Sequence, residues 1–465
     1  MMKRTNMLVT AFFGFAAAAS AGGLMTNTNY HIAFDRMMAR GASFDVDAVY
    51  SNPAGLVWSE HDGWQLSFNA QKPFQYRDIE ATLSQPYATA IGFEQHKFKG
   101  KASANPFVPA LFATYKHDNW AVGFMAGIVG SGGKCTYDDG VPQFAVPVRG
   151  MMGQVASGIN AGAGAAVVPA DFYRLDAFME GKQYIYGIQA NFAYRFNDHW
   201  SASVGLRANI YDGYNRGHVI ATTDNAIVSG AMGGTGELLR LNLDVDQRGW
   251  GLCPFLSVNY KYDRLVLTGR YEFRSKLNIP NDTKTLEIGA APALQAQPAF
   301  ASAATLAAPY QDGVKTRYDM PSLLSLAVGY ELTDQLRATA EYHFFDDKHA
   351  KMSGNRQDEL EHGTHEFLLG VEYDINDRLT VSCGAQRTDY GLSDNYQANT
   401  SFACDSYSIG LGAAYRLTEQ LRINAGYFCS LYSDYSREAN YLSIPVTETY
   451  SRTNNVFGLG IDYRF

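Results

Sequence analysis

Long stretches of the chain alternate apolar and polar residues with a period of two, which is the pattern of β-strands with one apolar face. The pattern is clearest at the C-terminus, where the apolar positions are Phe457, Leu459, Ile461, Tyr463 and Phe465. Segments 200–210 and 406–417 repeat it. A soluble β-sandwich would also alternate, but its polar face would carry more Lys and Glu and fewer Gly and Ser. The pattern therefore favours strands whose apolar face meets lipid, as in an outer-membrane β-barrel.

Six segments share a second pattern, in which an aromatic-ended strand, a short polar turn and another alternating strand follow one another. The turns contain Asp118, Asp198, Asp263, Asp334, Asp377 and Glu419. Asn and Asp suit such turns because their side chains can bond the nearby backbone. The other connections are long, and they span 73–106, 131–182, 213–248, 277–319, 347–362, 392–403 and 434–453. Short turns at one end and long loops at the other are typical of outer-membrane barrels.

The hairpins also give a strand count. Six hairpins supply twelve strands, and one further strand on each side, from Trp64 and from Asn454, brings the expected total to 14. We therefore predict an all-β fold, a transmembrane antiparallel β-barrel of about 14 strands. An even count places both ends of the barrel in the periplasm, and the aromatic strand that ends at Phe465 fits a signal for the outer-membrane assembly machinery.

The N-terminal part has a different character. Residues 1–21 read as a secretory signal peptide, with Lys3-Arg4, an apolar stretch over 7–19 and the small residues Ala19-Ser20-Ala21 before a cleavage point. Residues 22–63, called the hatch below, hardly alternate and are too long for a simple tail. We expect the hatch to fold inside a barrel formed by 64–465, in the outer membrane of a Gram-negative cell.

Composition narrows the classes of function. With 38 Lys and Arg against 46 Asp and Glu, the chain lacks the basic stripe of a nucleic-acid-binding protein. Beyond the N-terminus no segment approaches the roughly 18 uninterrupted apolar residues of a membrane-spanning helix. The five cysteines are sparse and irregularly spaced, so they predict neither a disulfide framework nor a metal site. No nucleophile elbow, nucleotide fingerprint or energy-coupling segment is recognisable, so we expect neither an enzyme nor a cofactor.

One stretch of the hatch carries a resemblance. Residues 40–48, Arg-Gly-Ala-Ser-Phe-Asp-Val-Asp-Ala, and then Asn52-Pro53-Ala54-Gly55-Leu56 resemble the N-terminal hatch of the FadL-type outer-membrane transporters of long-chain fatty acids and hydrocarbons. The resemblance implies a 14-stranded barrel plugged by the hatch, with Asn52, Pro53, Ala54 and Gly55 as its motif. It also implies capture of the ligand by extracellular loops, a luminal site beside the hatch N-terminus, and sideways release at a kink in the third strand.

The third strand is expected from Trp120 to Gly130, and glycines interrupt it at Gly123, Gly127 and Gly130. Glycine within a strand often marks a bulge, a bend or a close approach of the backbone. These three residues are therefore the candidate kink. The alternative is that they are only small residues facing the lumen.

Two of the expected loops are unusually apolar. Leu294, Phe300 and Leu306 lie in the segment 288–310, which has no charged residue, and Leu239 and Leu241 lie in 219–243. Exposed apolar patches usually mark binding or a membrane contact, so these five are the candidate capture residues. Loops that pack on each other to cap the barrel would have the same composition.

The lumen offers a candidate site for a carboxylate. Arg207 and Arg270 occupy equivalent positions on two strands that run in the same direction two places apart, and alternation sends both inward. Arg suits bidentate contact with the carboxylate of a fatty acid. Glu272, Glu341 and His343 complete the candidate luminal set, and the alternative is that the arginines form ordinary salt bridges with these acids or with an acid of the hatch.

The expected function is passive transport of hydrophobic molecules, most of all long-chain fatty acids, across the outer membrane. Outer-membrane lipid is then the surrounding partner, and nucleic acid is not one. The alternative is a surface receptor for haem or another hydrophobic cargo. His362 and His365 have a His-x-x-His spacing in a loop, which suits a metal or haem iron.

Overall fold

The computed structural model describes residues 25–465 except 28, 104–106, 297–299 and 301–307. The described strands form one antiparallel sheet, which closes into a barrel because β1 (Gly63–Thr82) pairs with β18 (Ile444–Arg464). Four of the barrel strands consist of two consecutive segments each, so the eighteen segments make the 14 strands that the sequence predicts. The two-segment strands are β2 with β3, β8 with β9, β10 with β11, and β16 with β17.

The strands between β1 and β18 follow in chain order: β2 (Gln95–Ser103), β3 (Val108–His117), β4 (Trp120–Tyr137), β5 (Arg174–Arg195), β6 (Trp200–Thr222), β7 (Glu237–Tyr262), β8 (Leu265–Glu272), β9 (Asn278–Ala290), β10 (Lys315–Arg317), β11 (Leu323–Glu331), β12 (Leu336–Phe345), β13 (Thr364–Asp374), β14 (Leu379–Asp389), β15 (Ser406–Arg416), β16 (Leu421–Tyr432) and β17 (Tyr435–Tyr441). The hatch contains α3 (Ile32–Met37), α4 (Ala48–Ser51) and the 3-10 helix η1 (Pro53–Trp58). The long connections contain α5 (Tyr87–Ile91), α6 (Pro142–Ala163), α7 (Ala226–Ala231), α8 (Pro292–Gln295), η2 (Ala308–Tyr310), η3 (Asp347–His349) and η4 (Ser353–Glu359). None of the helices in the described ranges is long and apolar enough to cross a membrane.

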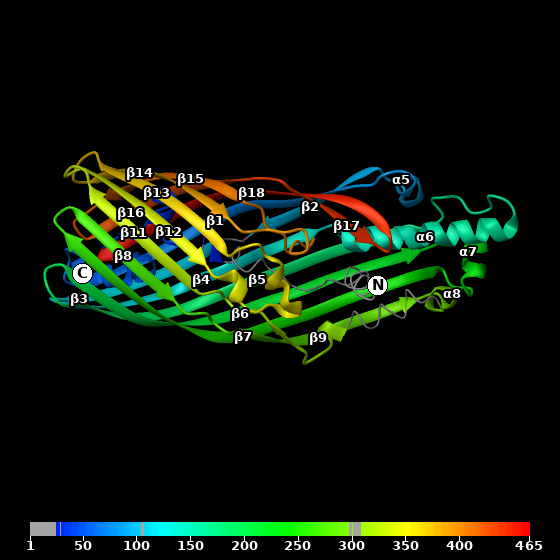
Figure 1. The fold of residues 1–465 in the computed structure, drawn as a ribbon, viewed down its shortest axis with the longest axis horizontal. Coiled ribbons are helices and arrows are strands. Elements are labelled where there is room, and N and C mark those ends of the chain that lie inside the picture. Colours follow the sequence, from blue (N-terminus) through cyan, green and yellow to red (C-terminus); the bar gives the residue numbers. More distant parts are fainter. Residues whose placement is uncertain (1–24, 28, 104–106, 297–299, 301–307) are drawn as a thin grey trace.

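The six predicted turns all lie at one end of the barrel, called the turn end below, and α5 to α8 lie at the other, called the loop end (Figure 1). Asp118 and Asp263 adopt positive φ angles of 49° in two of these turns, a conformation that Asp tolerates better than most residues. Trp200 packs against Tyr260 beside a third turn, with ring centroids 4.8 Å apart. These rings belong to an aromatic girdle of the kind expected at a lipid headgroup layer.

Strand β7 shows that the barrel extends beyond its lipid-facing band. Near the turn end its outward positions are apolar and its inward ones polar, as with exposed Leu256 and buried Ser257. Toward the loop end the same alternation continues with the opposite polarity. Leu241 is then buried inside, while Asp244 on the outer face pairs with Arg216 of β6 at 2.9 Å. The outer face changes from charged to apolar between Arg248 and Trp250, which sets the upper edge of the lipid-facing band.

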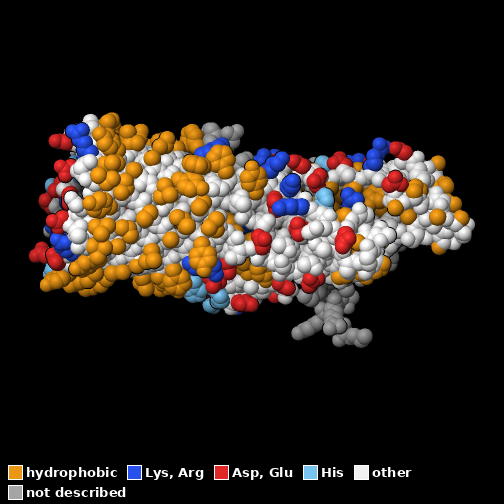
Figure 2. Space-filling model, turned by 90° about the horizontal axis from the view of Figure 1, so that it is seen from above, with side chains coloured by type: hydrophobic (Ala, Val, Ile, Leu, Met, Phe, Trp, Pro, Cys, Tyr) orange, Lys and Arg blue, Asp and Glu red, His pale blue; other side chains and the backbone are white. Residues whose placement is uncertain are grey.

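Figure 2 shows the same division over the whole surface. Hydrophobic side chains cover the part of the barrel nearer the turn end, whereas charged side chains are scattered over the middle of the surface, between this part and the tip of the loop end. Inside the loop end, α6 and the inner faces of the surrounding strands form an apolar core that includes Phe98, Phe144, Leu239, Leu241 and Leu294. The wall at the loop end is therefore an apolar-lined extension that stands above the lipid-facing band.

This extension corrects part of the loop prediction. Leu239 and Leu241 lie on β7 rather than in a loop, and both are buried. Leu294 does lie in a connection, within α8, but it is buried as well, and Phe300 packs against the same core. Leu306 lies outside the described residues. The predicted loop 213–248 was too long, because β6 continues to Thr222 and β7 begins at Glu237 with an apolar face that points inward.

The two ends of the barrel predict different labelling from outside the cell. A cysteine introduced as Asp198→Cys sits in an exposed turn, and one introduced as Ala226→Cys sits at the exposed start of α7. A membrane-impermeant maleimide added to intact cells should label the second and leave the first unlabelled until the cells are lysed. The unsubstituted protein serves as the background for its native cysteines. Labelling of position 198 alone would mean that the barrel has the opposite orientation.

Candidate functional site

The hatch lies inside the barrel, and all six residues of its helix α3 are buried. His31 caps this helix by accepting a hydrogen bond from the backbone N–H of Ala33 at 3.1 Å. The helix can approach the wall closely because the wall presents glycines there. A Cβ at Gly384 of β14 would collide with the carbonyl oxygen of Met37, and one at Gly410 of β15 would collide with that of Asp35. Inner-face glycines thus mark where the hatch touches the wall.

A buried carboxylate of β13 binds the hatch by charge. Glu372 accepts hydrogen bonds from Arg36 of α3 at 2.5 Å, from Arg40 of the hatch at 3.2 Å and from Arg337 of β12 at 3.1 Å. Arg40 also donates to both carboxylate oxygens of Asp47, at 2.6 and 2.9 Å. Charges removed from water must be paired to be tolerated, so this cluster fixes one position of α3 against the wall.

A second carboxylate holds the hatch backbone. Glu341 of β12 accepts hydrogen bonds from the backbone N–H groups of Arg40 at 3.0 Å and Gly41 at 2.8 Å. His343 lies between Glu341, at 2.7 Å, and Glu366, at 3.0 Å. The predicted luminal residues Glu341 and His343 therefore form a bridge between the wall and the hatch.

At the turn end, Asp45 of the hatch faces three arginines. Its carboxylate lies 3.1 Å from Arg422, 3.5 Å from Arg40 and 3.7 Å from Arg464. Burial alone would raise the pKa of Asp45, but the charges of Arg422, Arg40 and Arg464 outweigh it and hold that pKa well below its usual range. The carboxylate is therefore ionised at any physiological pH and ties the hatch to β16 and β18.

The hatch motif anchors the opposite side of the hatch. Asn52 donates to the carbonyl of Ser43 at 3.1 Å and to the side-chain oxygen of Asn259 on β7 at 3.0 Å. The Ser201 hydroxyl of β6 donates to the Ala54 carbonyl at 2.7 Å. Pro53 begins η1, where its missing N–H removes no helical hydrogen bond. A Cβ at Gly55 would collide with the Asn52 side chain, which explains why glycine stands there.

The predicted arginine pair meets on one carboxylate. Arg207 donates to both oxygens of Glu272, one of them at 3.2 Å, and Arg270 lies 3.3 Å from Glu272 as well. Arg270 also donates to the carbonyl of Tyr50 in the hatch. The structure thus brings these three predicted residues together, and it gives each guanidinium a partner from the protein itself.

The barrel wall is interrupted between β3 and β4. These strands pair from His117↔Trp120 to Leu111↔Ala126, and β4 pairs again with β2 only from Ala102↔Cys135. Between these points β4 has no ladder partner on this side within the described residues. On its other side, two register shifts against β5 leave Val129 and Gly132 as extra residues. Such bulges bend a strand and disturb its pairing.

The candidate kink glycines differ in position. Gly127 and Gly130 lie inside the interrupted stretch of β4, whereas Gly123 precedes it, within the ladder to β3. A Cβ at Gly123 would crowd Val49 and Leu56 of the hatch. Gly123 therefore makes room for the hatch, whereas Gly127 and Gly130 lie in the stretch of β4 that has no ladder to β3.

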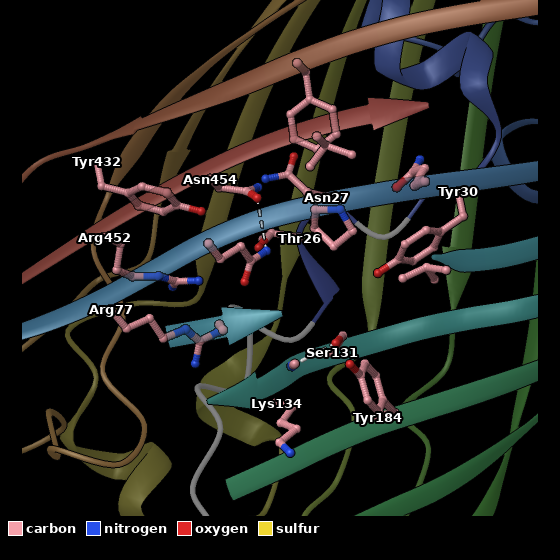
Figure 3. A pocket seen from close by; sticks show the side chains of 18 of the residues that line it. Thr26, Asn27, Tyr30, Arg77, Ser131, Lys134, Tyr184, Tyr432, Arg452 and Asn454 are labelled. Carbon is pink, nitrogen blue, oxygen red and sulfur yellow. Dashed lines mark hydrogen bonds between the residues drawn. The ribbon is translucent and has the colours of Figure 1, made fainter. Parts of the chain in front are cut away.

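A luminal cavity lies beside this interruption, and its empty volume is about 750 Å³ when the solvent space into which it opens is included. Thr26, Asn27 and Tyr30, near the start of the described part of the hatch, line it, together with Ser131 and Lys134 of β4 and Tyr184 of β5 (Figure 3). Its apolar lining consists of Pro73, Ala102, Val108, Phe428 and Val456. Figure 3 also shows Arg77 of β1 and Arg452 of β18 beside each other on one side of the cavity.

The residues that line this cavity were not among those predicted from the sequence pattern. Arg77 was missed because the first strand was expected to end near Lys72, whereas β1 continues to Thr82. The signal was present, since the inward parity of Gln71 continues through Gln75 to Arg77. Arg452 was missed because it lay within the predicted loop 434–453, whereas β18 already begins at Ile444.

Two further side-chain clusters among the described residues lack the geometry of a metal site or of an activated nucleophile. His362 and His365 lie with ring centroids 5.2 Å apart, but one nitrogen of His365 already meets the Tyr342 hydroxyl at 2.8 Å. In the part of the chain that the structure describes, no group of three or more His, Cys, Asp or Glu residues is placed to hold a metal ion. Ser67, His31 and Asp462 also meet, but Ser67 donates to Asp462 at 2.6 Å rather than to the imidazole, so its hydroxyl is not activated.

The Glu372 cluster predicts how the hatch can be loosened. Glu372→Gln removes the only carboxylate that pairs with Arg36 among the described residues, and breaking a buried ion pair in this way typically costs about 3–5 kcal/mol. We expect single-channel conductance in planar bilayers to rise while the barrel stays folded. Asp374→Asn is the matched control, since Asp374 pairs with Arg337 and has no ion pair to the hatch. Equal conductance of both variants and the unsubstituted protein would contradict the role given to Glu372.

Comparison with known proteins agrees with this architecture. Residues 286–465 match the family of the outer membrane protein β-barrel domain. No curated protein matches the sequence. A FadL homologue from Pseudomonas aeruginosa has a similar structure, with a TM-score of 0.65 and 17% identity over 95% of this chain and 100% of the other. The toluene transporter TodX from Pseudomonas putida is similar with a TM-score of 0.54 and 14% identity, over 91% of this chain and 95% of the other. The monoaromatic hydrocarbon channel CymD is similar with a TM-score of 0.53 and 13% identity, over 96% of this chain and 99% of the other. The chain is therefore an outer-membrane β-barrel with the fold of the FadL-type channels.

Proposed function

We propose that this protein lets hydrophobic molecules, most of all long-chain fatty acids, cross the outer membrane passively. The luminal cavity beside the first described hatch residues, at the interruption of the wall, is the observation that carries the proposal. The cavity extends from the interior of the barrel to the part of the described wall between β3 and β4 where no backbone ladder forms. Similarity to the structures of a FadL homologue and of the monoaromatic hydrocarbon channel CymD supports the same class of cargo.

The physical reason for such a path is the cost of wetting an apolar tail. Each methylene that leaves water contributes about 0.8 kcal/mol, so a long tail gains nothing from entering a water-filled pore. The hatch prevents that pore, because it occupies the lumen and is held by buried charges. A route lined by apolar side chains and open toward lipid keeps the tail out of water throughout.

Capture would take place at the loop end. The apolar core around α6 contains Leu239, Leu241 and Leu294, with Phe300 packed against it, and it lies above the lipid-facing band. An incoming tail that parts these side chains stays in an apolar environment. In this proposal the capture residues predicted from sequence act from inside the extended wall rather than from exposed loops.

Release would take place sideways, through the interruption between β3 and β4. Gly127 lies at its turn-end edge, where a Cβ would be 3.2 Å from the Cβ of Ala110 on β3. Gly130 and the two extra residues of β4 lie deeper in the gap. A tail leaving here enters the lipid layer directly, without passing the charged cluster at the turn end.

A reversible staple across the gap tests this route. Ala110→Cys with Gly127→Cys places two thiols within reach of a disulfide, whose Cβ atoms are typically about 3.8 Å apart. With Cys135→Ser to avoid mispairing, oxidation should abolish oleate uptake by cells, and reduction should restore it. A cysteine pair at Ala413 and Ala425, opposite each other in the continuous ladder of β15 and β16, is the matched control. Unchanged uptake in the oxidised staple would show that the cargo leaves by another path.

A further inference from the structure

Where the lipid-facing band ends on one side of the barrel, the outer surface carries a group of basic residues. On β7 the exposed Trp250 is followed, toward the loop end, by Arg248, whose side chain is 81% exposed. Just beyond β8 the exposed Phe273 is followed by Arg274 and Lys276. On these two neighbouring strands, the outer surface therefore changes from apolar to basic at the edge of the band.

The group is arranged around Asp319. The isolated bridge between Ser275 and Met320 extends the antiparallel pairing of β9 with β10, so that Asp319 lies opposite Lys276. On its other side, the N–H of Asp319 donates to the carbonyl of Lys351 at 2.9 Å. Both lysines are exposed. A lysine therefore lies on either side of Asp319, on neighbouring segments of the wall.

Asp319 does not balance the charge of this group. Its buried carboxylate already accepts two hydrogen bonds from Arg317, at 3.0 and 2.9 Å, and lies 3.6 Å from Arg274. Lys276 and Lys351 form no ion pair within the part of the chain that the structure describes. One carboxylate thus faces four cationic side chains, and the charge of the two lysines is not neutralised by an ion pair.

The nearest other acids have partners of their own. Asp346, in the connection after β12, is hydrogen-bonded to His349 at 2.6 Å. Asp212 of β6 lies 3.4 Å from Arg248 and pairs with Lys182 at 2.6 Å. The excess of positive charge therefore remains over β9, β10 and the segment that follows β12.

We propose that this basic edge binds the phosphate groups of the glycolipid that forms the outer leaflet of a Gram-negative outer membrane. The basic edge consists of Arg274, Lys276, Arg317 and Lys351. Lipid head groups lie at the level where a lipid-facing band ends, and basic clusters at that level attract anionic head groups. Charge-assisted hydrogen bonds from Arg and Lys to phosphate are roughly twice as strong as neutral ones.

The surroundings of the basic edge favour a lipid over a soluble anion. The exposed rings of Tyr271 and Phe273, with centroids 5.0 Å apart, adjoin it on the side of the lipid-facing band. The acyl chains of a bound glycolipid would cover these rings while its phosphates reach Lys276 and Lys351. The loop end faces outside in this proposal, as in the labelling experiment above, and the site is independent of the cargo that the lumen carries.

Native mass spectrometry of the purified protein in detergent tests this site. The probes are lipid A, the phosphorylated membrane anchor of the glycolipid, the same lipid stripped of its phosphates, and inorganic phosphate. Lys276→Gln and Lys351→Gln should each weaken the binding of lipid A about fivefold, which corresponds to about 1 kcal/mol, and should leave the dephosphorylated lipid unchanged. Lys284→Gln is the matched control, since it removes an exposed lysine of β9 that pairs with Asp282 at 2.6 Å.

Three results would overturn the site. The first is unchanged binding of lipid A in both variants. The second is equal loss of lipid A and the dephosphorylated lipid, because it would indicate damage to the wall. The third is binding of inorganic phosphate as tightly as lipid A, which would show a free-anion site. Each of them would leave the proposed transport function untouched, because neither Lys276 nor Lys351 lines the luminal cavity.

Discussion

The buried carboxylate of Glu372 is the interaction on which the interior of this barrel depends. It joins Arg36 and Arg40 of the hatch to Arg337 of the wall, and because Glu372, Arg36 and Arg40 are buried, an unpaired charge among them would be costly. Helix α3 can reach it because glycines of β14 and β15 let the backbone of the hatch approach the wall. A barrel of this size would otherwise hold an open aqueous channel. With the hatch in the lumen, the cavity beside the N-terminal part of the hatch is a space that a ligand could occupy.

The fold followed from the sequence wherever alternation and turns agree. The six hairpins and the one further strand on each side of them predicted 14 strands, and the outward apolar positions near the turn end, such as Leu256 and Leu459, are exposed as expected. Alternation does not say which face points inward, however. On β7 the polarity reverses above Trp250 while the parity is unchanged, so Leu239 and Leu241 were assigned to a loop although they line the extended wall. Only the three-dimensional course of β7 shows that its apolar face points inward near the loop end.

The candidate site was predicted less well, for a related reason. The inward direction of Arg207 and Arg270 was evident from parity, but their shared contact with Glu272 depends on which strands are neighbours and in which register. The pair Arg77 and Arg452 lies 375 residues apart in the chain and meets only because the first and last strands close the barrel. Closure places two like charges opposite each other beside a gap in the wall. Neither composition nor local pattern contains that information.

The central claim is that a hydrophobic cargo lies in the luminal cavity beside the hatch and near the interruption between β3 and β4. The most direct measurement is a crystal structure of the protein with a fatty acid brominated along its tail, in which anomalous scattering locates the bromine atoms. We predict bromine peaks in the luminal cavity, between Val108 and Ser131. Bromine peaks confined to the apolar core around α6, with an empty luminal cavity, would contradict the account.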